Sequence, residues 1–123
     1  MTQEKIETLM INNVEYVRKD QTQNMAEKVA GLEFCIVRTY SAGVFAGYVK
    51  DRIGKELTLI NSIRLWQWSG ASLSQVSQEG CPNKSNCKFG MVETVKYITE
   101  AIEITPCTEK AKIDIQSVKP WKV

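Results

Sequence analysis

The sequence predicts a single α+β domain, mainly an antiparallel β-sheet meander with two or three short helices. A length of 123 residues suits one domain. Residues 34–68 form runs rich in β-branched and aromatic residues, separated by turns that contain glycine. Residues 108–118 instead carry apolar side chains at helical spacing. We therefore expect a core over residues 33–123, preceded by an N-terminal hairpin extension over residues 1–20.

The N-terminal extension alternates apolar and polar residues around a turn. The segments 8–11 and 14–17 flank Asn12 and Asn13, and asparagine tolerates the positive φ that a two-residue hairpin turn needs. The sequence therefore predicts a β-hairpin here. Residues 18–32 are polar and predict a linker with a short helix near residues 24–30.

The central part of the chain predicts a meander of three strands, whose small and polar turn residues favour antiparallel pairing. The expected strands are 34–40, 44–50 and 56–68, with turns at 41–43 and 51–55. The last strand is long for a regular strand, so we expect a bend or bulge near Asn61 and Ser62.

The C-terminal part predicts two further helices around a pair of strands. Ser72 begins a helix that ends at Gly80, and residues 81–90 have the composition of a loop. Residues 91–105 alternate well enough for one or two strands that stop at Pro106. Thr108 caps a helix that runs to Val118, with Ala111 and Ile115 on the same face.

The composition argues against several classes of function. The chain has 16 basic and 14 acidic residues, too even a balance for duplex DNA or RNA as a partner. It has no histidine, which removes the commonest general base and the usual zinc ligand. We therefore expect a binding protein rather than an enzyme, with no catalytic residues and no cofactor.

The expected location is the cytoplasm, because nothing in the sequence resembles a signal peptide or a membrane span of about 20 apolar residues. The four cysteines should then stay reduced. Cys35 and Cys107 lie in apolar strands and are expected to be buried. Cys81 and Cys87 are spaced too widely for a zinc motif, so no metal site is predicted.

The first candidate binding feature is the series Arg64, Trp66 and Trp68 on one expected strand. Side chains two residues apart share a face of a strand, which places a guanidinium beside two indoles. Such a face can stack a base and bind a phosphate. It can equally pack against a helix or a second subunit, and a pocket between subunits satisfies both interpretations.

Two further segments are candidates for ligand binding. The turn 38–43 begins with Arg38 and consists of small and polar residues, so its backbone N–H groups form either an anion-binding nest or an ordinary hairpin turn. The loop 83–89 carries amides, cations and an aromatic that we expect to be exposed. It is either a site for a polar ring or a solvated loop. Its candidate residues are Asn86, Lys88 and Phe89.

Longer runs of residues resemble a family of small phage and prophage proteins, the Thoeris anti-defence type one proteins. They are RTYSAGVFAGYVKDRIGKELTLINSIRLWQWSGASLSQVSQEG, followed by CKF and YITEAIEITPCTEKAK. The resemblance covers roughly residues 34–121. It implies a protein that binds cyclic ADP-ribose isomers made by bacterial TIR immune enzymes, and sequesters them uncleaved in the infected host cell.

The resemblance also implies an assembly and a site. Members form dimers that join into hexamers as trimers of dimers, and the nucleotide pocket lies at the dimer interface. The matching positions here are Arg64 for the diphosphate and Phe89 for the adenine. Trp66 or Trp68 would add to the stack, and Thr99, Asn86 and Lys88 would supply polar contacts. Some members also bind cyclic oligonucleotides through arginines near the C-terminus, where this chain has Lys110, Lys112 and Lys119.

The sequence thus predicts a homo-oligomeric nucleotide sponge that binds a cyclic ADP-ribose isomer. The alternative is a protein–protein interaction module of a phage that binds no nucleotide, with the same basic and aromatic face docking a partner.

Overall fold

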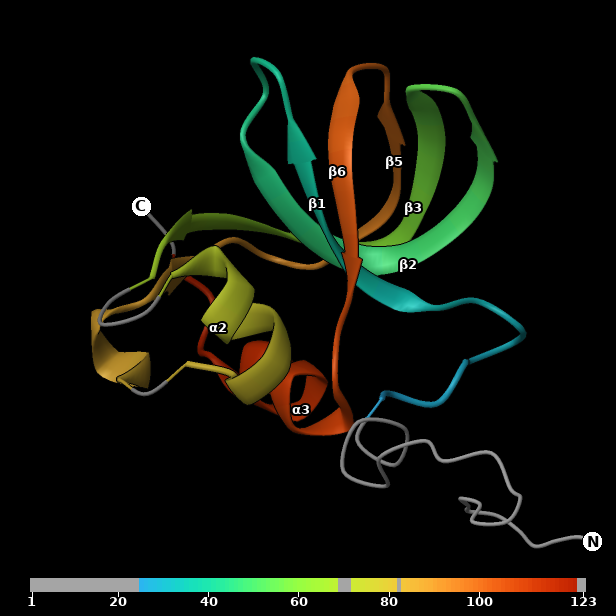
Figure 1. The fold of residues 1–123 in the computed structure, drawn as a ribbon. Coiled ribbons are helices and arrows are strands. Elements are labelled where there is room, and N and C mark those ends of the chain that lie inside the picture. Colours follow the sequence, from blue (N-terminus) through green and yellow to red (C-terminus); the bar gives the residue numbers. More distant parts are fainter. Residues whose placement is uncertain (1–24, 69–71, 82, 122–123) are drawn as a thin grey trace, which may run out of the picture.

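The computed structural model describes residues 25–68, 72–81 and 83–121. They form a strongly curled antiparallel sheet of six strands with two helices packed on its outside, as the sequence predicts (Figure 1). The elements in chain order are β1 (Phe34–Thr39), β2 (Val44–Ile53), β3 (Glu56–Gln67), α2 (Leu73–Glu79), a 3₁₀ turn η1 (Lys84–Asn86), β4 (Lys88–Phe89), β5 (Glu93–Ile98), β6 (Ala101–Pro106) and α3 (Glu109–Ser117). The hairpin predicted within residues 1–20 lies outside the described residues.

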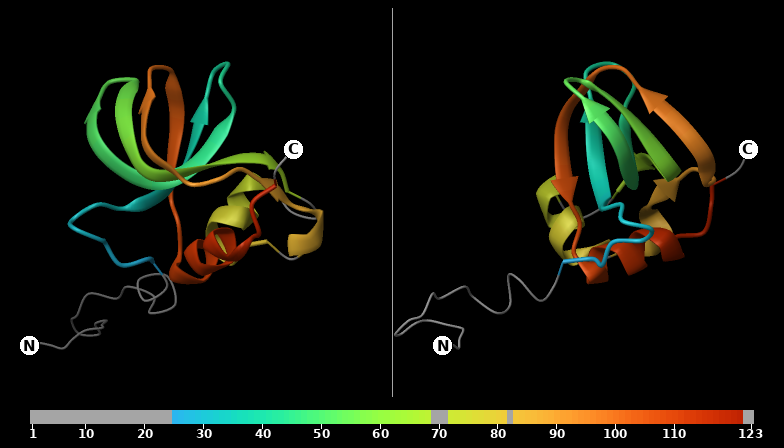
Figure 2. Two further views of the ribbon diagram at one scale, coloured as in Figure 1. Left: turned by 180° about the vertical axis from the view of Figure 1, so that it is seen from behind. Right: turned by 90° about the vertical axis from the view of Figure 1, so that its right-hand side faces the viewer.

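The strand order is β4-β3-β2-β1-β6, and β5 pairs with the first half of β3. β5 and β6 are joined by a short turn, yet each pairs with a different strand of the meander. The turn between β5 and β6 therefore carries the chain from the β3 side of the sheet to the β1 side. Figures 1 and 2 show the β1–β2, β2–β3 and β5–β6 turns gathered at the end of the sheet away from α2 and α3.

The two faces of the curled sheet bury two separate apolar clusters, because successive side chains of a strand point to opposite sides. One face packs on α2 and α3 through residues such as Ile36, Ala46 and Ile63, and we call it the helix face. The opposite, inner face carries Val37 and Phe45 among others. This second cluster is enclosed by the curl of the sheet itself.

The predicted irregularity in the long third strand is confirmed. Asn61 has a φ of 50°, and the pairing with β2 skips between Ile60 and Ile63. Gly47 of β2 lies opposite this bulge, where a Cβ atom would come within 3.0 Å of Ser62. A bulge increases the local twist of a strand, and it contributes here to the curl that encloses the inner face.

Both predicted helix starts are confirmed at their caps. The Ser72 hydroxyl accepts from the Gln75 N–H, and the Gln75 side chain accepts from the Ser72 N–H, which is a capping box. Thr108 accepts from the Ala111 N–H and donates to the carbonyl oxygen of Gln78, so one side chain begins α3 and ties it to α2. Gly80 ends α2 with a φ of 85°.

Three local predictions are wrong. No helix forms among the described residues 25–32, because Ala30 and Gly31 both take positive φ in a turn between Val29 and Leu32. The turn predicted at 51–55 is shorter, since β2 continues to Ile53. The loop predicted at 81–90 contains η1 and the short strand β4. In the described part of the chain, no helix is long and apolar enough to cross a membrane.

Candidate functional site

A line of neighbouring cations and aromatic rings crosses the sheet from β5 to the C-terminal segment. The Arg64 guanidinium carbon lies 4.5 Å from the centre of the Phe45 ring and 5.2 Å from that of Trp66. We call this line the cation–aromatic row. In spatial order its members are Lys96, Phe45, Arg64, Trp66, Trp121 and Lys88. Each cation in the row has an aromatic ring at a distance typical of cation–π contacts.

Arg64 occupies the centre of the row because of the sheet register. It lies directly opposite Phe45 across the β2–β3 pair, so both side chains stand on the inner face. Its guanidinium donates to the carbonyl oxygen of Ala42 at 2.5 Å. A Cβ atom on Gly43 would lie 3.2 Å from the same guanidinium, so a larger residue there would crowd the arginine.

Arg64 is charged and half-buried, yet among the described residues no carboxylate lies within ion-pair distance of it. A carbonyl and two ring faces satisfy part of its hydrogen-bonding and electrostatic needs. The guanidinium has five N–H donors, so it retains capacity for a bidentate anion such as a phosphate.

A second cation approaches Phe45 from β5. The Lys96 ammonium lies 4.9 Å from the centre of that ring and 2.6 Å from a carboxylate oxygen of Glu93. Its side chain is only 17% exposed. Arg64 and Lys96 therefore bring two positive charges to one ring, and Glu93, the described partner of Lys96, offsets one of them, which leaves this part of the inner face with a net positive charge.

The outer end of the row is built by β3, β4 and the C-terminal segment. The Trp66 and Trp121 rings meet edge to face at 6.4 Å, and the Lys88 ammonium lies 5.3 Å from the Trp121 ring. The Trp121 N–H donates to the carbonyl oxygen of Phe89 and so fixes the tryptophan beside β4. Trp66 is 58% exposed, so much of its indole is accessible to a planar ligand.

The sequence correctly placed Arg64 and Trp66 side by side on the face opposite Ile63, but it was wrong about Trp68. β3 ends at Gln67, and its pairing with β4 shifts between Leu65 and Gln67. The alternation is lost at this point, and Trp68 packs against the cluster of the helix face. Trp68 is therefore a packing residue.

Phe89 is not the exposed loop aromatic that the sequence predicted. It is 1% exposed, because it belongs to β4, pairs with Leu65 and lies in the core under the helix face. In this conformation its ring has no free face for a base. Trp66 and Trp121 are the accessible aromatic side chains nearest to Arg64 in the row.

The other predicted site residues do not converge on Arg64. Thr99 is exposed in the β5–β6 turn beside Ile98, which pairs with Leu57 at the opposite end of β3. Asn86 is exposed in η1, and its carbonyl oxygen accepts from the Gln67 side chain. Arg38 forms an ion pair of 2.8 Å with Glu103 and follows the alternation to the helix face of β1. Lys88 alone joins the row.

The turn after β1 is an ordinary hairpin turn. The N–H groups of Thr39, Tyr40 and Ala42 are bonded to Gly43, Glu100 and the Thr39 hydroxyl, respectively. They are therefore not open for an anion. The contribution of this turn is the Ala42 carbonyl that holds Arg64.

Three members of the row were missed by sequence reasoning. Phe45, Lys96 and Trp121 come from β2, β5 and the C-terminal segment, which are far apart in the chain. The lone Trp121 near Lys119 resembles any surface aromatic in sequence. The signal that the sequence contained is the spacing of Arg64 and Trp66, two residues apart on one strand.

The four cysteines are buried and free. Burial raises the pKa of the Cys35, Cys81 and Cys107 thiols to about 12. They are therefore neutral thiols near pH 7, unsuited to nucleophilic chemistry. No group of three or more potential metal ligands occurs within the described ranges of the chain.

The fold and the row define a small curled-sheet protein with a basic and aromatic surface. A family model described as "Domain of unknown function (DUF6948)" matches residues 32–115, more than half of the chain. The protein therefore belongs to the DUF6948 family. No curated protein and no solved structure matches the chain.

Proposed function

We propose that this protein binds a small anionic nucleotide at the cation–aromatic row and sequesters it without cleaving it. The observation that carries the proposal is the half-buried Arg64, which has no described carboxylate partner and stands between Phe45 and the open ring of Trp66. A cation next to an accessible indole fits a phosphate joined to a base. Stacking on such a ring is worth roughly 1–3 kcal/mol per base.

The ligand class we propose is a cyclic ADP-ribose isomer, the class that the sequence resemblance implies for a phage anti-defence protein. Arg64 and Lys96 would bind the two phosphates of its diphosphate, and Trp66 would stack the adenine. This assignment replaces Phe89 with Trp66 as the stacking residue, because the Phe89 ring is covered. The chain has no histidine, and the carboxylate described beside the row, that of Glu93, is paired with Lys96, in keeping with binding without turnover.

We also propose that the protein is a homodimer or a larger homo-oligomer. β5 pairs only with β3 among the described strands, so its other edge is open. Val95 and Tyr97 on this strand are 47% and 78% exposed. An open edge with exposed apolar side chains is a surface on which a second copy can pack. Thr99 and Asn86, which lie away from Arg64 in one chain, would then need a partner subunit to reach a ligand.

Calorimetry with a purified cyclic ADP-ribose isomer tests the ligand. The full chain should bind, and Arg64→Ala should weaken binding by about 10- to 100-fold, the loss expected for charge-assisted hydrogen bonds. Arg64→Lys should recover only part, because an ammonium lacks the bidentate fork. Arg38→Ala is the matched control, since Arg38 lies on the other face and pairs with Glu103.

The same samples separate binding from catalysis. Heat denaturation of the complex should release the ligand with unchanged mass and retention time. The absence of both heat and a thermal shift at ligand concentrations far above micromolar would refute the nucleotide proposal. Release of a cleaved product would refute sequestration.

The second candidate function, a protein-interaction module, is supported by the exposed Val95 and Tyr97 of β5. It predicts a stable monomer in light scattering and a stoichiometric partner that is lost with Tyr97→Asp. A dimer that dissociates with Tyr97→Asp while nucleotide still binds would favour the first proposal.

A further inference from the structure

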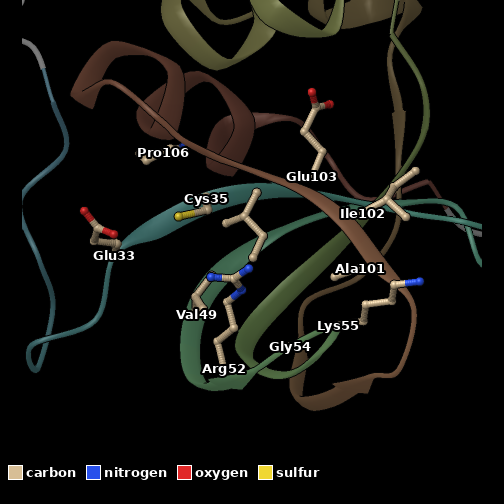
Figure 3. Close-up of a pocket in the computed structure, with 11 residues that line it drawn as sticks. Glu33, Cys35, Val49, Arg52, Gly54, Lys55, Ala101, Ile102, Glu103 and Pro106 are labelled. Atoms are coloured by element: carbon tan, nitrogen blue, oxygen red, sulfur yellow. The ribbon is translucent and has the colours of Figure 1, made fainter.

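A groove of about 700 Å³ lies between β6 and the last residues of β2, away from the cation–aromatic row (Figure 3). Its floor is apolar and consists of the side chains of Cys35, Val49, Ala101 and Ile104. Cys35 and Ala101 are buried, and Val49 and Ile104 pack against the inner cluster. The groove and the row have no lining residue in common, so each can be occupied independently.

Two incompletely paired strand edges flank this groove. β6 pairs with β1 and with no other described strand, and β1 stops pairing with β2 at Tyr48. The Val49 N–H still donates to the Glu33 carbonyl oxygen. From there to Ile53, β2 has no described neighbour on that side. The two edges meet at one end of the groove, where the Ala101 N–H donates to the Lys55 carbonyl oxygen at 3.0 Å.

The charges of the groove favour an extended segment that carries both signs. Figure 3 shows the Arg52 guanidinium extending into the groove, and no described carboxylate lies within ion-pair distance of it. Glu33 and Glu103 line the opposite part, where Glu103 is paired with Arg38. A strand with a carboxylate near Arg52 and a cation near Glu33 would complement both parts.

We propose that this groove binds the chain's own N-terminal segment, residues 9–19, as one added β-strand, in place of the hairpin that the sequence predicts for residues 8–17. The described chain begins beside the groove: Met25 bridges to Thr108, and the Ala26 N–H donates to the Cys107 carbonyl oxygen at 3.0 Å. Cys107 adjoins Pro106, which lines the groove. The 24 residues that precede Met25 are tethered there, and an extended chain spans about 3.3 Å per residue, enough to traverse the groove.

The sequence of this segment matches the groove in pattern and in charge. Val14 and Tyr16 are two residues apart, so in a strand they share the face that would lie over the apolar floor, and Glu15 between them stands on the other face. Glu15 supplies a carboxylate for Arg52. Arg18 and Lys19, closer to the tether, supply cations for the acidic part of the rim. A tether of this length keeps the segment at a millimolar effective concentration, so even a weak docking surface becomes occupied.

Hydrogen–deuterium exchange of the full chain, read by mass spectrometry, tests this docking. Peptides covering residues 9–19 should exchange about tenfold or more slowly than an unprotected chain, since docking shields their amides. Arg52→Glu should abolish that protection, and Tyr16→Asp, within the segment itself, should do the same. Lys110→Glu makes the same charge change on the exposed side of α3 and should leave the protection intact.

The core amides of β1 and β3 report whether each variant still folds, so a loss of protection confined to residues 9–19 and the groove strands supports the proposal. Unprotected exchange of residues 9–19 in the natural sequence would overturn it. So would protection that survives both Arg52→Glu and Tyr16→Asp, because the segment would then dock elsewhere. Protection that rises with protein concentration would assign the groove to the segment of a second copy and overturn docking within one chain.

Discussion

Replacement of Gly47 by alanine tests whether close contact between β2 and the β3 bulge stabilises the curled sheet. A Cβ atom at this position would lie 3.0 Å from both Cα and Cβ of Ser62 and 3.4 Å from the Ile60 carbonyl oxygen. These distances to backbone atoms are too short for the side chain alone to adjust, so the strands must separate. Overpacking of this kind typically costs about 1–3 kcal/mol. We expect Gly47→Ala to lower the free energy of unfolding by this amount.

Urea denaturation monitored by tryptophan fluorescence measures the effect. The midpoint should fall while the slope with denaturant concentration stays constant, because the surface exposed on unfolding is unchanged. Gly54→Ala is the control, because the added methyl group does not crowd any neighbouring atom there. Gly54 has a φ of 60°, and a Cβ atom added there would have no other atom within 4 Å, so alanine incurs a backbone cost without a contact.

A double variant locates the contact. Ser62→Gly removes one of the two atoms at 3.0 Å, so Gly47→Ala should cost less in its presence, with a coupling of about 0.5 kcal/mol or more. Strictly additive effects would show that the two residues do not interact. A Gly47→Ala protein as stable as the natural one would refute the reasoning about the bulge.

Two further predictions concern the helix cap and the cysteines. Thr108→Ala should lower the free energy of unfolding by about 1–2 kcal/mol, because it removes the α3 N-cap and the hydrogen bond to Gln78. Thr108→Ser is the control, since it keeps the hydroxyl. Equal urea midpoints for the two variants would contradict this prediction. Burial raises the pKa of Cys35 and Cys107 to about 12 from an ordinary value of 9.0, so the folded state holds these protons more tightly than the unfolded state. Their contribution to stability is therefore complete below pH 9 and is lost as the pH rises from 9 toward 12. Thermal unfolding across that range should show a shallower decline for Cys107→Ala than for the natural sequence, and parallel declines would refute it.

The proposed nucleotide site and the proposed docking groove lie on the same inner side of the sheet but depend on different cations. Arg64 belongs to the middle of β3, and Arg52 to the end of β2. Arg64→Ala should therefore leave the exchange of residues 9–19 unchanged, and Arg52→Glu should leave nucleotide affinity unchanged. The two experiments consequently fail or succeed independently.

Local chemistry was sufficient for most of the secondary structure. The turn glycines, the caps at Ser72 and Thr108 and the irregularity at Asn61 follow from interactions within a few residues, and each was predicted correctly. The helix predicted near residues 24–30 was wrong because a contact between residues far apart in the chain decides this segment. Its composition allowed a helix, but pairing of Met25 with Thr108 holds that part of the chain in an extended conformation.

The sequence by itself determined the fold class and the placement of Arg64 beside Trp66, because a strand's period of two decides which side chains share a face. Only the tertiary structure decided that this shared face is the inner face of the curled sheet, and which other side chains join Arg64 and Trp66 there. The register shift after Leu65 left Trp68 packed against the cluster of the helix face, and pairing of β4 with β3 buried Phe89. Strand pairing and the path of the C-terminal segment brought Lys96 and Trp121 into the row. Such contacts join residues far apart in the chain, and local periodicity carries no information about them.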